Sequence, residues 1–309
     1  MLQIGKEAPG TQALERWRKE YGDVFTYWLG NTPFVALCSF DSIQEVLVNN
    51  ADSCTDREFF DDFYRLIRGK KDGIFNINGA VWREHSSFIY RSFKNSGIGK
   101  ESFESGVLSE LEWLFESVNK ELTKNEGFVE QLSHCVDVFV ASTVNLWLLG
   151  YTFGGNKSEE FLEIKRSVVE FMAYSGEPLP SIVRCCPKVF APLPYFRNVV
   201  KEIRTKIEAM HSYFEKQIKG LGDGKLTENE EITDECYVSS FLKESENREG
   251  RDNFDAETLV GMLRDFWIAG QDTVTNTLEW GLIFMILNQD KQDKLHEELN
   301  RVIGEERND

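Results

Sequence analysis

The sequence predicts a mainly α-helical fold with a small N-terminal β-hairpin and a long central helix. Most stretches with regular apolar spacing run for more than about ten residues, a length typical of helices rather than strands. Residues 24–29 and 34–38, near the N-terminus, are instead short runs rich in β-branched and aromatic residues. One proline-free stretch, residues 255–287, is long enough to form the central helix.

The composition is that of a globular protein with a substantial core. The 309 residues are 41% hydrophobic and 28% charged, which is ordinary for such a protein. The net charge of -17 offers no positive field for phosphates, so we expect no nucleic-acid partner. The six cysteines form no Cys-x-x-Cys pair, and the four histidines lack the spacing of a zinc site. Nothing at the N-terminus resembles a signal peptide, and no run of 18 or more apolar residues could span a bilayer. Without a secretion signal, we expect the cysteines to be reduced thiols in a cytosolic compartment.

The N-terminal third contains the hairpin and its flanking helices. Between the two strands, Gly30 and Asn31 are typical of a turn. An amphipathic helix is expected before the hairpin and another helix after it, followed by a mostly irregular, charged connection. These three segments are residues 11–21, 42–49 and 51–78.

Four helical patterns fill the middle of the chain, at residues 102–125, 129–150, 161–174 and 195–219. Between the last two, residues 176–196 form a proline-broken, apolar connection. Apolar residues on a surface loop indicate a contact with a membrane or a ligand, although the loop packing on its own helices explains them equally well. Residues 220–233 and 244–253 are expected to be polar linkers.

The central helix has a clear start and an unusual second half. Asp255 is expected to be its N-cap, and Glu257 lies in the first turn, where the helix dipole favours an acid. At about 1.5 Å per residue, the helix would be roughly 50 Å long. Residues 280–287 are apolar on every side, so we expect this half to be buried all round.

The middle of this helix carries small and polar residues. Ala269 and Gly270 leave almost no side chain, and the Thr273 hydroxyl can bond back to the Ala269 carbonyl. Together with Asp272, they would form an open face that accepts a planar ligand and passes protons. A helix-packing glycine beside a solvated aspartate is the simpler explanation, and these residues alone favour it.

A longer string around these residues changes that balance. Residues 266–280, Phe-Trp-Ile-Ala-Gly-Gln-Asp-Thr-Val-Thr-Asn-Thr-Leu-Glu-Trp, resemble the oxygen-binding helix of the cytochrome P450 family, the haem-thiolate monooxygenases. The resemblance is to the animal microsomal type, and residues 288–304 resemble the helix that follows. It implies that Ala269 and Gly270 face the haem, and that Asp272 and Thr273 deliver protons during oxygen activation.

A second string, residues 73–100, resembles the haem-propionate helix of the same family. The family pattern is Trp-x-x-x-Arg; Trp82 is present here, but Ser86 stands at the arginine position. Arg83 or His85 would replace that arginine only if the helix rotated. Core packing is the alternative role for Trp82.

The connection before this helix adds one further candidate. By the resemblance, Arg57 falls where an arginine often approaches a haem propionate, and a charged guanidinium is suited to that contact. A solvated loop arginine is at least as reasonable for Arg57.

The resemblance covers essentially the whole chain and implies a partial cytochrome P450 fold, one incomplete domain over residues 1–309. The family's Glu-x-x-Arg helix and its cysteine loop would follow the last residue, and none of the six cysteines has a Phe-x-x-Gly-x-x-x-Cys context. The implied cofactor is haem b, whose axial cysteine is expected to be absent from these residues.

The implied activity is insertion of one oxygen atom into a lipophilic xenobiotic, fatty acid or steroid-like molecule. Electrons would come from a flavoprotein NADPH reductase, docked on the basic residues Arg83, Arg91, Lys94 and Lys100. The implied location is the cytoplasmic face of the endoplasmic reticulum, with residues 176–196 touching the membrane. Without an anchor in these residues, a cytosolic location is the alternative.

A non-catalytic product is the competing hypothesis. A chain that lacks the axial thiolate has no ligand to favour O–O cleavage. It would at most bind haem weakly or hold an apolar ligand. The 309-residue chain is then expected to be inactive by itself.

Overall fold

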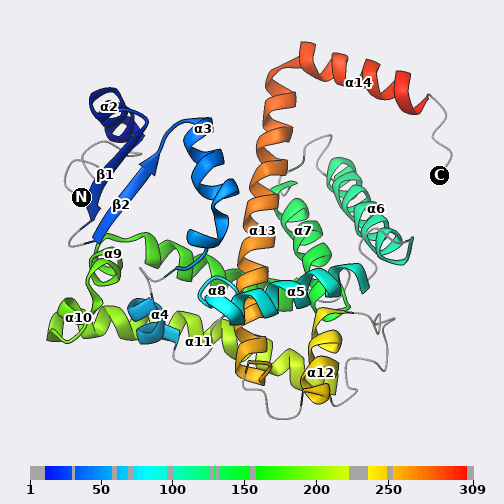
Figure 1. Ribbon diagram of the computed structural model, residues 1–309. Helices are drawn as coiled ribbons and strands as arrows, with labels where there is room; N and C mark the ends of the chain where they lie inside the picture. The colour runs from blue at the N-terminus through cyan, green and yellow to red at the C-terminus, as the bar shows by residue number, and fades with distance from the viewer. Residues whose placement is uncertain are drawn as a thin grey trace. The chain divides into compact units, whose positions relative to one another are not determined.

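The computed structural model describes residues 11–304 except residues 30–31, 58–60, 69–72, 96–100, 125–128, 130–131, 154–157, 223–235 and 249–252. Within them the fold is mainly α-helical with one two-stranded sheet, as the sequence predicts (Figure 1). In chain order, the elements are α2 (Thr11–Tyr21), β1 (Val24–Leu29), β2 (Thr32–Leu37), α3 (Phe40–Ile43), the π-helix η1 (Gln44–Asn49), the 3-10 helix η2 (Ala51–Ser53), α4 (Asp61–Arg68), α5 (Gly79–Asn95), α6 (Glu101–Lys124), α7 (Leu132–Leu149), α8 (Ser158–Gly176), α9 (Pro178–Cys185), α10 (Pro187–Phe190), α11 (Pro194–Gly222), α12 (Tyr237–Asn247), α13 (Ala256–Leu287) and α14 (Gln289–Ile303).

The N-terminal hairpin is confirmed. Strands β1 and β2 pair antiparallel, with Val24 opposite Leu37. Trp17 of α2 packs on the hairpin, with its ring centroid 6.0 Å from that of Tyr27. Aromatic rings on one face of the hairpin thus bury each other, which is how a small sheet gains stability.

Three segments expected to be irregular contain helices. α4 lies within residues 51–78, α9 and α10 lie within residues 176–196, and α12 extends into residues 244–253. Pro178 and Pro187 are the first residues of α9 and α10. Proline suits this position because the first N–H groups of a helix have no acceptor within the helix, so proline loses no hydrogen bond there. Pro178, Pro187 and Pro194 therefore begin helices, whereas Pro192 lies between α10 and α11.

Three sequence predictions fall outside the described residues. They are the turn at Gly30 and Asn31, the end of the string at residues 73–100, which includes Lys100, and most of the linker at residues 220–233.

The chain divides into two compact units, each assembled from separate segments. Unit 1 consists of Met1–Tyr90, Arg166–Glu215 and Gly250–Met262, and unit 2 consists of Arg91–Lys165, Lys216–Glu249 and Leu263–Asp309. The single incomplete domain expected over residues 1–309 remains a prediction.

The core of unit 2 is built around α7. Trp147 of this helix stacks on Phe93, with 4.4 Å between ring centroids, and also contacts the buried ring of Tyr237. Among the described helices, α7 is long and apolar enough to cross a membrane, but 61% of that stretch is buried inside the protein. This helix corresponds to the helical pattern predicted over residues 129–150. Its burial is that of a core helix.

The second half of α13 differs most from expectation. Residues 280–287 were expected to be buried all round, yet Trp280 is 69% exposed and Leu287 is 75% exposed. The following helix, α14, adds exposed apolar side chains such as Leu295 and Ile303. Apolar composition creates a tendency to bury, but burial also needs a covering surface, and the described residues of unit 2 supply none for this face.

Candidate functional site

The start of α13 confirms its predicted N-cap. The Asp255 carboxylate accepts a hydrogen bond from the backbone N–H of Thr258 at 2.7 Å. This bond satisfies one of the N–H groups that a helix leaves unpaired in its first turn. The helix then runs without interruption to Leu287 and so carries residues 269–273 near its middle.

The centre of α13 has the predicted hydroxyl-to-carbonyl bond. Thr273 Oγ1 donates to the Ala269 carbonyl oxygen at 2.6 Å. Asn276 Nδ2 donates to the Asp272 carbonyl at 2.7 Å, and Thr277 Oγ1 donates to the Thr273 carbonyl at 2.8 Å. Three side chains therefore compete with the helical N–H groups for carbonyls within two turns, which loosens the ladder locally.

Gly270 is a packing glycine. A Cβ atom at this position would lie 3.0 Å from Cγ2 of Val144 on α7. The missing side chain therefore lets α13 and α7 approach each other closely within unit 2. This is the simpler of the two roles considered for Gly270, and it directs that face of α13 towards a helix.

Ala269 and Thr273 leave a more open face. They lie one turn apart, Thr273 is exposed and Ala269 is half-buried. The Ala269 side chain is small, and the Thr273 hydroxyl bonds to the backbone of its own helix. Little side-chain volume therefore projects from this face, which suits a flat group. This low surface at Ala269 and Thr273 is compatible with the haem that the family resemblance implies, and the haem-facing roles of Ala269, Gly270 and Thr273 stay predictions.

Asp272 points to a polar cluster instead of to solvent. Its carboxylate accepts a hydrogen bond from Lys165 Nζ at 2.7 Å, and its side chain is 28% exposed. The same ammonium group lies 3.1 Å from Asp137 Oδ1 on α7. Gln271, which is fully buried, donates to Asp137 at 2.8 Å and accepts from Lys165 at 2.9 Å.

Unit 1 holds the other two candidates, Arg57 and Trp82. The backbone N–H of Arg57 donates to the Asn78 side chain at 2.9 Å, and Asp56 accepts from the Gly79 N–H at 3.1 Å. These bonds tie the loop to the first turn of α5, which also carries Trp82. Within the described residues, neither the exposed Arg57 guanidinium nor the half-buried Trp82 indole N–H has an acceptor. Guanidinium and indole N–H groups are donors of the kind that binds a carboxylate such as a haem propionate, and this role of Arg57 and Trp82 stays a prediction.

The two residues considered as substitutes for the missing arginine have other partners. Arg83 pairs with Asp52 at 3.1 Å on the surface. His85 is buried, its Nε2 lies 2.8 Å from the Asn253 carbonyl, and its ring stacks on Phe254 at 4.3 Å between centroids. Neither side chain takes the place that Ser86 leaves.

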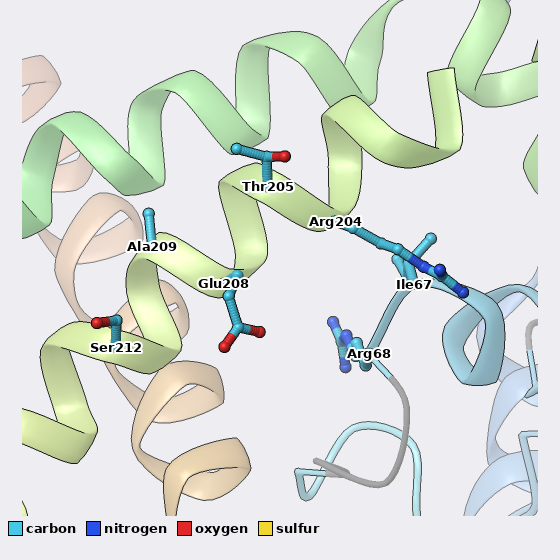
Figure 2. A pocket seen from close by; sticks show the side chains of 7 residues that line it. All are labelled: Ile67, Arg68, Arg204, Thr205, Glu208, Ala209 and Ser212. Atoms are coloured by element: carbon cyan, nitrogen blue, oxygen red, sulfur yellow. The ribbon is translucent and has the colours of Figure 1, made fainter. Parts of the chain in front are cut away.

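Unit 1 also contains a pocket between α4 and α11, with a volume of about 660 Å³ (Figure 2). It is lined by Ile67, Arg68, Arg204, Thr205, Glu208, Ala209 and Ser212. Arg68 and Glu208 face each other across it, and Arg204 Nε donates to the Leu66 carbonyl at 2.7 Å. The size suits a small molecule, but this charged lining differs from the apolar walls that a lipophilic substrate requires.

Sequence reasoning missed Asp137 and Lys165. Asp137 had a usable signal, because it is the one Asp, Glu, Lys or Arg residue in the apolar helix α7. A lone acid in a buried helix needs a partner. Lys165 had no such signal, since it lies in a helix with many charges and reaches Asp272 across 107 positions of sequence.

Comparison with known proteins gives one consistent family. A family model described as Cytochrome P450 matches residues 1–309. Cytochrome P450 2U1 of Homo sapiens is 30% identical over 291 residues, which cover 93% of this chain and 51% of that protein. Cytochrome P450 2H2 of Gallus gallus is 24% identical over 302 residues, covering 96% of this chain and 57% of that protein. The chain thus spans about half the length of these relatives. With the family model matching the entire chain and the α13 hydroxyl bond in place, the protein belongs to the cytochrome P450 family.

Proposed function

We propose that this chain is part of a haem-dependent monooxygenase that inserts one oxygen atom into a lipophilic small molecule. The observation that carries the proposal is the centre of α13. There the Thr273 hydroxyl bonds to the Ala269 carbonyl beside the Asp272 acid, in a member of the cytochrome P450 family. Xenobiotics, fatty acids and steroid-like molecules are the substrate classes, with electrons from a flavoprotein NADPH reductase.

Haem, when bound, supplies the oxygen activation, and the residues of this chain supply its surroundings. Ala269 leaves room for the flat macrocycle. With its hydrogen directed at the Ala269 carbonyl, the Thr273 oxygen presents its lone pairs to the open face, where it can accept a hydrogen bond. Asp272, as a carboxylate, can take up and release a proton one residue away. These two residues are our candidates for proton delivery.

Arg57 and Trp82 are our candidates for holding a haem propionate. A guanidinium and an indole N–H both donate to carboxylates, the guanidinium through charge-assisted bonds. With Ser86 in the arginine position, Arg57 has to supply the positive charge at this end of α5. The axial thiolate is not assigned to any of the six cysteines.

The reductase and membrane contacts are proposed from surface residues. Arg91 and Lys94 on α5 supply positive charge for an acidic reductase, together with Arg83; Lys100 lies outside the described residues. Val189 and Tyr195 are exposed apolar residues within residues 176–196, which we propose to touch the membrane at the cytoplasmic face of the endoplasmic reticulum.

The test is Thr273→Ala in the full-length enzyme, reconstituted with haem and reductase. We expect oxygen consumption to continue while product per oxygen falls, because protons then reach the site in an uncontrolled way. Thr277→Ala is the matched control, since Thr277 makes the same type of hydroxyl-to-carbonyl bond one turn later. Equal product per oxygen in the wild type and both variants would contradict the proton-delivery role.

A second candidate function applies to residues 1–309 alone, as an inactive product that binds an apolar ligand or weakly binds haem. The exposed apolar face of α13 and α14 favours it. Adding haem to the purified 309-residue chain, followed by reduction and CO, separates the candidates. We expect no thiolate-type Soret band, and a clean band would show that one of the six cysteines is an iron ligand.

A further inference from the structure

A polar cluster joins three helices of unit 2 around one lysine. Lys165 of α8 reaches Asp137 on α7 at 3.1 Å, and on α13 it reaches Gln271 at 2.9 Å and Asp272 at 2.7 Å. The side chains are partly to fully withdrawn from solvent: Lys165 and Asp137 are each 19% exposed and Gln271 is fully buried. Charged groups at this depth are rarely left without partners.

The cluster is matched donor for acceptor. A lysine ammonium has three N–H donors, and Lys165 has three acceptors, one from each of Asp137, Gln271 and Asp272. Gln271 adds a second constraint, because its oxygen accepts from Lys165 while its nitrogen donates to Asp137 and, at 3.3 Å, to Thr275. This pattern suits one orientation of the Gln271 amide. Asp137 on α7 and Gln271 on α13 therefore hold the Lys165 ammonium group in place independently of Asp272.

We infer that Lys165, held in place by Asp137 and Gln271, is the positioning residue of the Asp272 carboxylate. This inference rests on the proposed function, in which Asp272 handles a proton. Lys165 fixes the direction of that carboxylate, and Asp137 ensures that the lysine keeps a negative partner at all times. The sequence motif around Asp272 contains neither Lys165 nor Asp137.

The competing role is a simple clasp that ties α7, α8 and α13 together. A clasp would stabilise the fold without any special effect on Asp272. The two roles separate when the carboxylate of Asp272 is observed directly and when variants of both residues are combined.

The first measurement is carboxyl ¹³C NMR on the 309-residue chain with ¹³C-labelled aspartate. Asp272→Asn identifies the Asp272 signal by its disappearance. We expect Lys165→Met to move this signal and Lys165→Arg to restore it largely, because arginine keeps the charge and offers more donors. An Asp272 signal that Lys165→Met leaves in place would overturn the inference.

Lys206→Met is the matched control in unit 1. Lys206 is 17% exposed, against 19% for Lys165, and it also lies near two carboxylates, those of Glu170 and Glu202. Its loss should destabilise the chain without moving the Asp272 signal. If Lys165→Met fails to fold, Asp137→Asn serves instead, since it keeps the side-chain shape. We then expect the Asp272 signal to move as the lysine loses one charge partner, and an unmoved signal again contradicts the inference.

The second measurement is product per oxygen in the reconstituted full-length enzyme. Lys165→Met should lower this ratio, and combining it with Asp272→Asn should lower it no further than Asp272→Asn alone, because both changes act through one carboxylate. If the losses of product per oxygen in Lys165→Met and Asp272→Asn add fully in the double variant, Lys165 only ties the three helices together. Should the wild type oxidise no substrate, the proposed function fails, while the NMR comparison still decides whether Lys165 positions Asp272.

Discussion

Gly270 and Gly281 show how neighbours give the same residue type different roles in one helix. A Cβ at Gly270 would lie 3.0 Å from Val144, whereas a Cβ at Gly281 would meet no atom within 4 Å. Glycine in a helix interior costs about 1 kcal/mol relative to alanine, because its unfolded chain is more flexible. At Gly281 that cost brings no packing benefit within the described residues.

The pair yields a prediction at the residue scale. Gly281→Ala should raise the free energy of unfolding by about 0.5–1 kcal/mol. Gly270→Ala should gain less or lose stability, because its methyl group crowds Val144 and offsets the helix preference. Urea unfolding of the two variants beside the wild type measures the difference. Equal stabilisation by both substitutions would mean that α7 yields easily to the added methyl group.

At the scale of the element, the second half of α13 combines strong helix formation with poor burial. Its side chains from Trp280 to Leu287 include many large apolar residues, and most of them are exposed. Helical hydrogen bonds form within the segment, so the helix does not need a partner to satisfy its backbone. Its apolar side chains gain little until a surface covers them.

A dye measures this exposed face. The 309-residue chain should bind the apolar fluorophore ANS, and replacing Ile286 and Leu287 with lysine should reduce the fluorescence, because both side chains lie in the exposed patch. Replacing the buried residues Leu148 and Leu149 with alanine is the contrasting control, which should loosen the core and raise the signal. Unchanged fluorescence in the Ile286 and Leu287 variant would locate the dye-binding surface elsewhere.

At the scale of the whole molecule, a buried tyrosine in the core of unit 2 should make the free energy of unfolding fall at alkaline pH. Burial raises the pKa of Tyr237 above its ordinary value of about 10. Above that pH the unfolded chain loses this proton while the folded chain keeps it. The unfolded state then binds fewer protons, so the free energy of unfolding must fall as pH rises.

The expected loss from Tyr237 is about 1.4 kcal/mol per pH unit once pH exceeds about 10. Tyr237→Phe should remove this part of the slope, and urea unfolding across that pH range measures it. Burial also raises the pKa of Cys135, which adds to the same alkaline slope. Cys135→Ala should therefore be made both in the wild type and in Tyr237→Phe. Tyr195→Phe, at an exposed tyrosine, is the control. An unchanged slope in Tyr237→Phe would assign the alkaline loss to other groups.

The sequence by itself determined the features that depend on near neighbours in the chain. The mainly helical class, the hairpin, the Asp255 cap and the Thr273 bond to Ala269 were all predicted, because caps and one-turn contacts involve residues three or four positions apart. The same reasoning missed α4 and α9, where short helices lie among charged residues and prolines.

Only the tertiary structure decided which of these residues meet distant partners. Val144 opposite Gly270, and Lys165 with Asp137 beside Asp272, are pairings between helices far apart in sequence. The exposure of residues 280–287 is likewise a property of what lies around them. Side-chain chemistry limits the possible partners, but helix packing brings them within the few ångströms over which hydrogen bonds and steric contacts act.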